Sequence, residues 1–122
     1  MRPINVVLAH HNPIMARALA ESLRPQFRKL AIVNNMSDAG AEIARLRAGF
    51  VIVDLELFSY SDLQTLCSEF PGTVFATVHR LADETMWLQS LAVGAVDCCQ
   101  SSDVRGLLRA SARHTGALGA AA

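Results

Sequence analysis

The chain has 122 residues, of which 52% are hydrophobic and 18% are charged, and eleven basic residues balance eleven acidic ones. This length and composition fit one compact domain and exclude a disordered chain. The neutral total gives no general attraction to nucleic acid or to an anionic membrane, and no apolar run is long enough to span a bilayer. The three cysteines do not make a disulfide framework, so we expect a reducing, cytoplasmic setting.

Predicted strands and helices alternate along the chain. Short apolar segments predict strands over residues 4–9, 30–33, 50–54, 73–78 and 95–99. Caps and breakers predict helices from Asn12-Pro13 to Pro25, from the cap Ser37 to Gly49, from Ser61 to Pro71-Gly72, from about Asp83 to Gly94, and from Ser102-Asp103 to about His114. Residues 1–114 therefore form the expected domain, and the Gly/Ala-rich residues 115–122 are predicted to be a flexible tail or the start of a linker.

Five strand–helix units in strict alternation predict an α/β fold with a parallel sheet and helices on both faces. The usual arrangement is the flavodoxin-like, doubly wound order 2-1-3-4-5 with five helices. Such sheets bind ligands at their carboxyl edge, at the switch point between strands one and three. Those two strands end at His10-His11 and at Asp54. Thr77 and Ser101 end the fourth and fifth strands and are expected to flank the same crevice.

Asp54 is the centre of the predicted site. It follows the apolar run Val51-Ile52-Val53, which is typical of a strand buried on both faces of a parallel sheet. A carboxylate at the end of such a strand is costly to bury without a partner. Its presence therefore favours a binding or reaction site over a simple loop cap.

Four segments of the chain form a recognisable pattern: Asn12-Pro13-Ile14-Met15-Ala16-Arg17, Val51-Ile52-Val53-Asp54-Leu55, Phe75-Ala76-Thr77-Val78 and Gly94-Ala95-Val96-Asp97. Together they resemble the receiver domain of two-component response regulators (CheY-like), nearest the LuxR/NarL-type subfamily that carries a helix-turn-helix output domain. Their order and spacing carry the resemblance, which covers nearly the whole chain.

The resemblance implies a phosphoryl-transfer site. In that family the aspartate that ends strand three takes a phosphoryl group from a histidine kinase, and an acidic pair after strand one holds Mg²⁺. A serine or threonine after strand four and a lysine after strand five bind the phosphoryl oxygens, and an aromatic residue on strand five changes rotamer as a switch. By position, Asp54 matches the acceptor and Thr77 matches the hydroxyl.

Four positions depart from the family pattern. His10 and His11 replace the acidic pair, Ser101 replaces the lysine, and Cys98 replaces the aromatic residue. Mg²⁺ prefers carboxylate oxygens, whereas imidazole suits transition metals. Two of the three electrostatic contributions to phosphoryl transfer are therefore missing. We predict no enzyme, no bound cofactor, weak or absent Mg²⁺ binding, and a receiver that acts mainly by phosphorylation-independent protein–protein interaction or dimerisation.

Two alternatives remain open at this stage. In the first, Asp54 still accepts a phosphoryl group, and a histidine kinase is then a partner. In the second, His10, His11, Asp54 and Glu56 form a transition-metal-responsive site, because they have suitable ligand atoms. Adjacent strand residues face opposite ways, which argues against two histidines binding one ion.

The helix from Asp83 and the last helix form the expected interaction surface, because this region is the usual partner surface in the family. Helical spacing predicts that the first of these helices buries Trp87, Leu88, Leu91 and Ala92, and that it exposes Met86, Gln89 and Val93. The last helix carries a basic ridge formed by Arg105, Arg109 and Arg113. We expect a homodimer or another protein to bind there, and any DNA-binding output to lie beyond Ala122 or in a partner.

Overall fold

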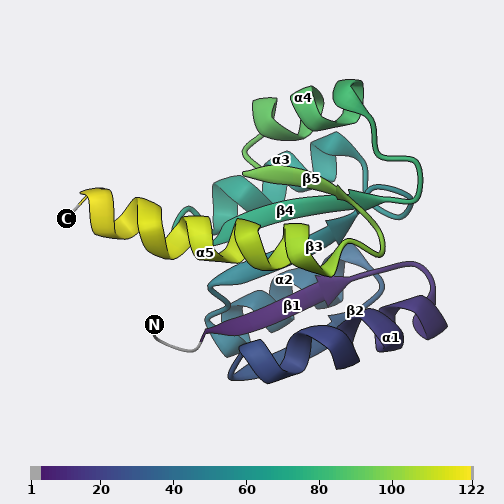
Figure 1. The fold of residues 1–122 in the computed structure, drawn as a ribbon, viewed down its shortest axis with the longest axis horizontal. Helices are drawn as coiled ribbons and strands as arrows, with labels where there is room; N and C mark the ends of the chain where they lie inside the picture. Colours follow the sequence, from purple (N-terminus) through teal and green to yellow (C-terminus); the bar gives the residue numbers. More distant parts are fainter. Residues whose placement is uncertain (1–3, 122) are drawn as a thin grey trace.

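The computed structural model describes residues 4–121, with side chains described as far as Arg113. It is a three-layer α/β domain, in which a parallel sheet lies between two layers of helices (Figure 1). The strands are β1 (Asn5–Ala9), β2 (Lys29–Val33), β3 (Phe50–Asp54), β4 (Val74–His79) and β5 (Asp97–Gln100). Their order is β2-β1-β3-β4-β5, which confirms the predicted flavodoxin-like arrangement.

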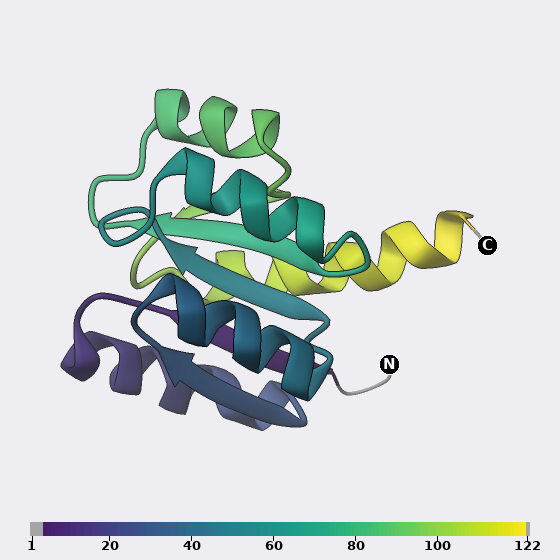
Figure 2. The same ribbon diagram turned by 180° about the vertical axis from the view of Figure 1, so that it is seen from behind.

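Five α-helices connect and cover the strands. They are α1 (Pro13–Leu23), α2 (Met36–Leu46), α3 (Tyr60–Glu69), α4 (Glu84–Ala92) and α5 (Val104–Ala121), with a short 3₁₀ turn η1 (Arg24–Gln26) after α1. Helices α1 and α5 lie in front of the sheet in Figure 1, and the opposite view in Figure 2 shows α2 and α3 on the other face. No helix within residues 4–121 is both long and apolar enough to cross a membrane.

Successive residues of the central strands pack alternately into two separate hydrophobic cores, one on each face of the sheet. On β1, Val6 packs in the core under α1 and α5, whereas its neighbour Val7 packs in the core under α2 and α3. The same alternation separates Ile52 from Val53 on β3. The uninterrupted apolar runs therefore arise because both faces of the sheet are covered.

Two helix starts differ from the sequence prediction. The cap of α2 is Asn35, whose side chain accepts the Asp38 N–H at 2.8 Å, so Ser37 lies inside the first turn. The cap of α3 is Ser59 rather than Ser61, because Ser59 and Asp62 form a reciprocal capping box. In both cases a polar residue upstream has the extended backbone that a cap requires.

The last two elements also differ in extent. Strand β5 covers Asp97–Gln100 instead of residues 95–99, since Gly94 has a positive φ of 121° and the chain turns there. Helix α5 continues to Ala121, past the predicted end near residue 114. Alanine is the strongest helix former, which accounts for helix in this alanine-rich segment. The division into a domain of residues 1–114 and a tail of residues 115–122 stays a prediction.

Candidate functional site

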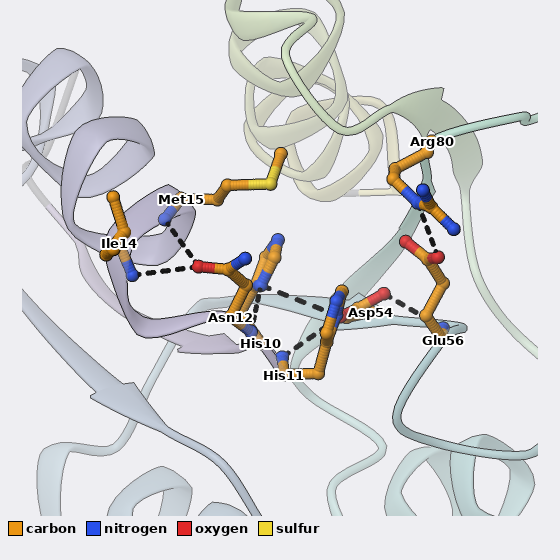
Figure 3. A network of polar contacts seen from close by, with 8 residues as sticks. All are labelled: His10, His11, Asn12, Ile14, Met15, Asp54, Glu56 and Arg80. Atoms are coloured by element: carbon orange, nitrogen blue, oxygen red, sulfur yellow. Dashed lines mark hydrogen bonds and ion pairs between the residues drawn. The ribbon is translucent and has the colours of Figure 1, made fainter.

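Asp54 lies at the carboxyl edge of the sheet, where β1 and β3 end side by side with Ala9 opposite Val53. Its side chain is fully buried. Two backbone groups bind it: the His11 N–H donates to Oδ2 at 3.0 Å, and the Glu56 N–H donates to Oδ1 at 2.9 Å. Both carboxylate oxygens are therefore held by the loops that follow β1 and β3 (Figure 3).

The His11 side chain adds a third hydrogen bond to the same carboxylate. Its Nδ1 lies in hydrogen-bond contact with Asp54 Oδ2. Since an ionised carboxylate can only accept, the proton of this bond is on Nδ1. The His11 side chain is 35% exposed, so the ring covers Asp54 from the solvent side. This contact closes the crevice over the carboxylate.

These contacts determine the charge of Asp54. Burial by itself raises the pKa of the Asp54 carboxyl, but the hydrogen bonds from the His11 side chain and from the backbone of His11 and Glu56 outweigh it, and the pKa is lowered. Hydrogen bonds to the charged form of a carboxyl stabilise that form. Asp54 is therefore an ionised carboxylate at neutral pH.

His10 is buried beside this pair and is neutral. Its Nδ1 accepts the Asn12 N–H at 3.0 Å and lies 3.6 Å from Asp54 Oδ2. Burial lowers the pKa of His10, against the opposing effect of the Asp54 charge. The proton is thus on Nε2, which has no hydrogen-bond partner in the part of the chain that the structure describes. His10 does not supply the positive charge that a bound metal would.

The two imidazoles lie together and do not point to opposite faces. Their ring centroids are 5.1 Å apart and their planes differ by 15°, so the rings stack. The expectation that they face opposite ways is wrong, because β1 ends at Ala9 and both histidines belong to the following loop. Asn12 fixes this loop, since its side chain also accepts the N–H groups of Ile14 and Met15 at the start of α1.

Glu56, which belongs to the alternative metal site considered from the sequence, lies outside the group of ligand atoms that the structure brings together. Its Oε1 accepts the Arg80 Nε–H at 2.7 Å, and Oε2 is buried with no partner among the described residues. Within those residues, the group whose ligand atoms lie within 4.8 Å of one another consists of His10, His11 and Asp54. The Arg80 contact had no local sequence signal, since the two residues belong to different loops.

Thr77 does not flank the crevice. It is in register with Val53 and shares the face of the sheet that α2 and α3 cover, whereas Asp54 is in register with Val78 on the other face. Its Oγ1 is 2.8 Å from Ser90 Oγ of α4, and both residues are fully buried. The predicted role of Thr77 as the phosphate-site hydroxyl is therefore corrected.

Cys98 lies on β5, and Ser101 directly follows this strand. Ser101 is buried, and its hydroxyl has no partner within residues 4–113. It lines a cavity of about 190 Å³ between α1 and α5, together with Met15 and Val104. Cys98 is half-buried, with a free thiol. Neither side chain supplies a cation to the crevice.

The exposed side of α4 also differs from the prediction. Trp87 and Leu88 are 40% and 54% exposed, whereas Ser90 is fully buried. Met86 is half-buried and Val93 packs against the core, which leaves Gln89 as the exposed member of the predicted strip. The helix is apolar on most sides, so spacing alone did not fix its orientation. The buried Thr77–Ser90 hydrogen bond fixes it.

Arg105 and Arg109 are exposed, as predicted for the basic ridge. Arg113 is also exposed, but it contacts its own chain: Nη1 donates to the Val96 carbonyl at 2.7 Å, and Nη2 lies 4.0 Å from Asp97 Oδ2. The Trp87 indole N–H donates to the other oxygen of Asp97 at 3.1 Å. Asp97 thereby links α4 with α5 across β5.

Solved structures that superpose on this chain include receiver domains of response regulators. A response regulator from Thermotoga maritima superposes with a TM-score of 0.80 at 21% identity, covering 93% of this chain and 98% of that one. The receiver domain of NarL from Mycobacterium tuberculosis gives 0.77 at 12% identity, covering 91% and 98%. A Burkholderia pseudomallei response regulator with a phosphorylated aspartic acid and a calcium ion gives 0.78 at 21% identity, covering 98% and 73%.

No protein-family model and no curated protein matches the sequence. The fold is therefore established by structure: it is the fold of response-regulator receiver domains, LuxR-type regulators among them. The likeness in sequence is low, and the side chains at the carboxyl edge of the sheet must support any statement about function.

Proposed function

We propose that this chain is a receiver-like signalling domain that acts by protein–protein interaction without phosphorylation. The observation that carries the proposal is the state of Asp54, whose carboxylate accepts three hydrogen bonds from His11 and Glu56 inside a closed crevice. A phosphoryl donor needs access to a carboxylate oxygen, but the Asp54 side chain is fully buried and both of its oxygens accept hydrogen bonds, Oδ2 from the loop after β1 and Oδ1 from the loop after β3.

The groups around Asp54 also fail to supply the charges that phosphoryl transfer needs. That reaction depends on cations that neutralise the transferring oxygens. The two imidazoles at the positions of the acidic pair give Mg²⁺ nitrogen atoms in place of carboxylate oxygens. Ser101 offers a hydroxyl where a lysine would supply a charge. Weak or absent Mg²⁺ binding is part of this proposal.

The interaction surface in this proposal is the α4–β5–α5 face, defined by Trp87, Leu88, Arg105 and Arg109. Its apolar centre consists of the exposed side chains of Trp87 and Leu88. The two arginines on α5 are exposed, and so are Asp83 and Glu84 at the start of α4. Opposite charges on one face fit a two-fold homodimer, in which acidic and basic groups of the two copies meet.

Sedimentation velocity at several protein concentrations tests both parts of this proposal. We expect weak self-association that is the same with and without acetyl phosphate and Mg²⁺. Leu88→Glu should abolish it, because the charge falls in the apolar centre. Ile14→Glu is the matched control, since Ile14 is an apolar residue that is 80% exposed on α1, away from this face. Association that requires the phosphodonor, or that survives Leu88→Glu, would contradict the proposal.

A second candidate function is that of a phospho-receiver supplied by a histidine kinase. The ionised state of Asp54 supports it, because a carboxylate is the nucleophile in such a reaction. His11 would have to turn away from Oδ2 before a donor could approach. The two candidates differ in one observable, which is phosphoryl transfer to Asp54.

A further inference from the structure

We propose that His10 Nδ1, His11 Nδ1 and Asp54 Oδ2 form a binding site for one divalent transition-metal ion such as Zn²⁺ or Ni²⁺. This inference concerns a ligand of the crevice and does not depend on how the domain signals. It rests on the position of the three ligand atoms, on the hydrogen bonds that they make, and on a cavity that borders the two histidines.

The spacing of the ligand atoms is close to that of a metal centre. Zn²⁺ binds imidazole nitrogen and carboxylate oxygen at about 2.0–2.2 Å, which places neighbouring ligand atoms of a tetrahedral ion roughly 3.4 Å apart. His10 Nδ1 is already 3.6 Å from Asp54 Oδ2, and the ligand atoms of the three residues all lie within 4.8 Å of one another. The shorter His11–Asp54 contact holds a proton, which the ion would replace.

Both histidines can bind through neutral rings. His10 Nδ1 carries a lone pair, because it accepts the Asn12 N–H, and that amide would give up its acceptor to the ion. Binding of the ion at His11 Nδ1 would replace the proton that this nitrogen shares with Asp54, and the N–H of the bound ring would then be on Nε2. The partial exposure of the His11 ring lets water solvate the new N–H.

The charge of the site favours a dication. Asp54 supplies one negative charge to balance the ion, and the two imidazoles add none. Glu56, the next carboxylate along the loop, is already paired with Arg80. Nitrogen ligands select Zn²⁺, Ni²⁺ and Cu²⁺ over Mg²⁺ and Ca²⁺, which prefer oxygen. The site is therefore expected to discriminate against the Mg²⁺ that receiver domains use.

A cavity reaches the two histidines of this site. It has a volume of about 180 Å³ and is also lined by Pro13, Asn34 and Asp38. The exposed Asp38 carboxylate, which also accepts the Asn35 side-chain amide, adds negative charge to the lining of this cavity. The same cavity has room for water at a fourth coordination position, which three protein ligands leave open.

Isothermal titration of the purified chain with ZnCl₂, NiCl₂ and MgCl₂ tests the site. We expect one Zn²⁺ or Ni²⁺ per chain and much weaker Mg²⁺ binding. His11→Ala and Asp54→Asn should each weaken Zn²⁺ binding by more than about tenfold, since even changes behind the direct ligands have that effect. His10 is buried, so His10→Ala is compared only if its melting curve stays cooperative.

Two control variants separate this site from other metal-binding side chains. His79→Ala removes a histidine whose Nδ1 accepts the Leu81 N–H in a different loop, and Cys98→Ser removes a half-buried thiol. Both should bind Zn²⁺ like the parent chain. No saturable binding, equal affinity for Mg²⁺, binding retained in His11→Ala, or binding lost in either control would overturn the assignment. These metal-binding results are independent of the proposed function, because signalling without phosphorylation is tested by phosphoryl transfer to Asp54.

Discussion

Replacing Asp54 by asparagine is expected to destabilise the domain, because the carboxylate holds two loops together. It accepts two backbone N–H groups and the His11 side chain. An asparagine keeps one oxygen and presents an NH₂ group to donors on the other side. Hydrogen bonds to a charged group contribute about 1.5–3 kcal/mol each, and relief from burying the charge offsets part of the loss.

We expect a net loss of about 2 kcal/mol in the free energy of unfolding, which corresponds to a fall in Tm of roughly 5–10 °C for a domain of this size. Urea denaturation followed by circular dichroism measures it, with an unchanged m-value as the check on two-state unfolding. Glu42→Gln is the control, since Glu42 pairs with Arg45 on the exposed side of α2 and should leave stability nearly unchanged.

A double-mutant cycle with His11→Ala assigns the loss to the His11–Asp54 contact. The coupling energy should be about 1 kcal/mol or more, since residues that share a hydrogen bond are not additive. Equal or higher stability of Asp54→Asn, or additive single changes, would refute the conclusion that His11 closes the crevice over an ionised carboxylate.

Two further predictions follow from contacts that the sequence did not show. Ser90→Ala should lower the free energy of unfolding by about 1–2 kcal/mol, because it removes the 2.8 Å partner of the buried Thr77 hydroxyl and leaves only the long 3.5 Å contact with the Asp97 carbonyl, and adding Thr77→Val should recover most of the loss. Thermal melts of both variants measure this, and a double variant no better than Ser90→Ala would count against the contact. Asn35→Ala should cost about 1 kcal/mol as the loss of a helix cap, and Ser37→Ala clearly less. The urea midpoints of the two variants measure these losses. A larger loss in Ser37→Ala than in Asn35→Ala would show that Ser37 is the cap, as the sequence predicted.

The sequence predicted the sheet and the centre of the site for a physical reason. Strands buried on both faces are uninterrupted apolar runs, and in parallel sheets the strand ends meet at one edge. Asp54, His10 and His11 could therefore be placed together before the structure was known. Their stacking could not, because it depends on where β1 ends.

The errors arise where one residue of register or one helical face decides the outcome. Thr77 is one position before the residue opposite Asp54, and a shift of one residue moves a strand side chain to the other face. For α4, apolar residues lie on most sides, so helical spacing predicted the wrong buried side, and the buried residue of this helix is Ser90. A small polar residue such as Ser90 on an otherwise apolar helix is the sequence feature that could have indicated which side of α4 is buried.

The central claim is that Asp54 does not receive a phosphoryl group, and intact mass spectrometry after incubation with acetyl phosphate and Mg²⁺ tests it most directly. A positive control restores the receiver pattern with three changes, His10→Asp, His11→Asp and Ser101→Lys. We predict no phosphoryl adduct on the parent chain and a partial adduct on the restored variant, because carboxylates and a lysine return Mg²⁺ and a cation to the crevice. A stoichiometric adduct on the parent chain that disappears in Asp54→Asn would contradict the claim.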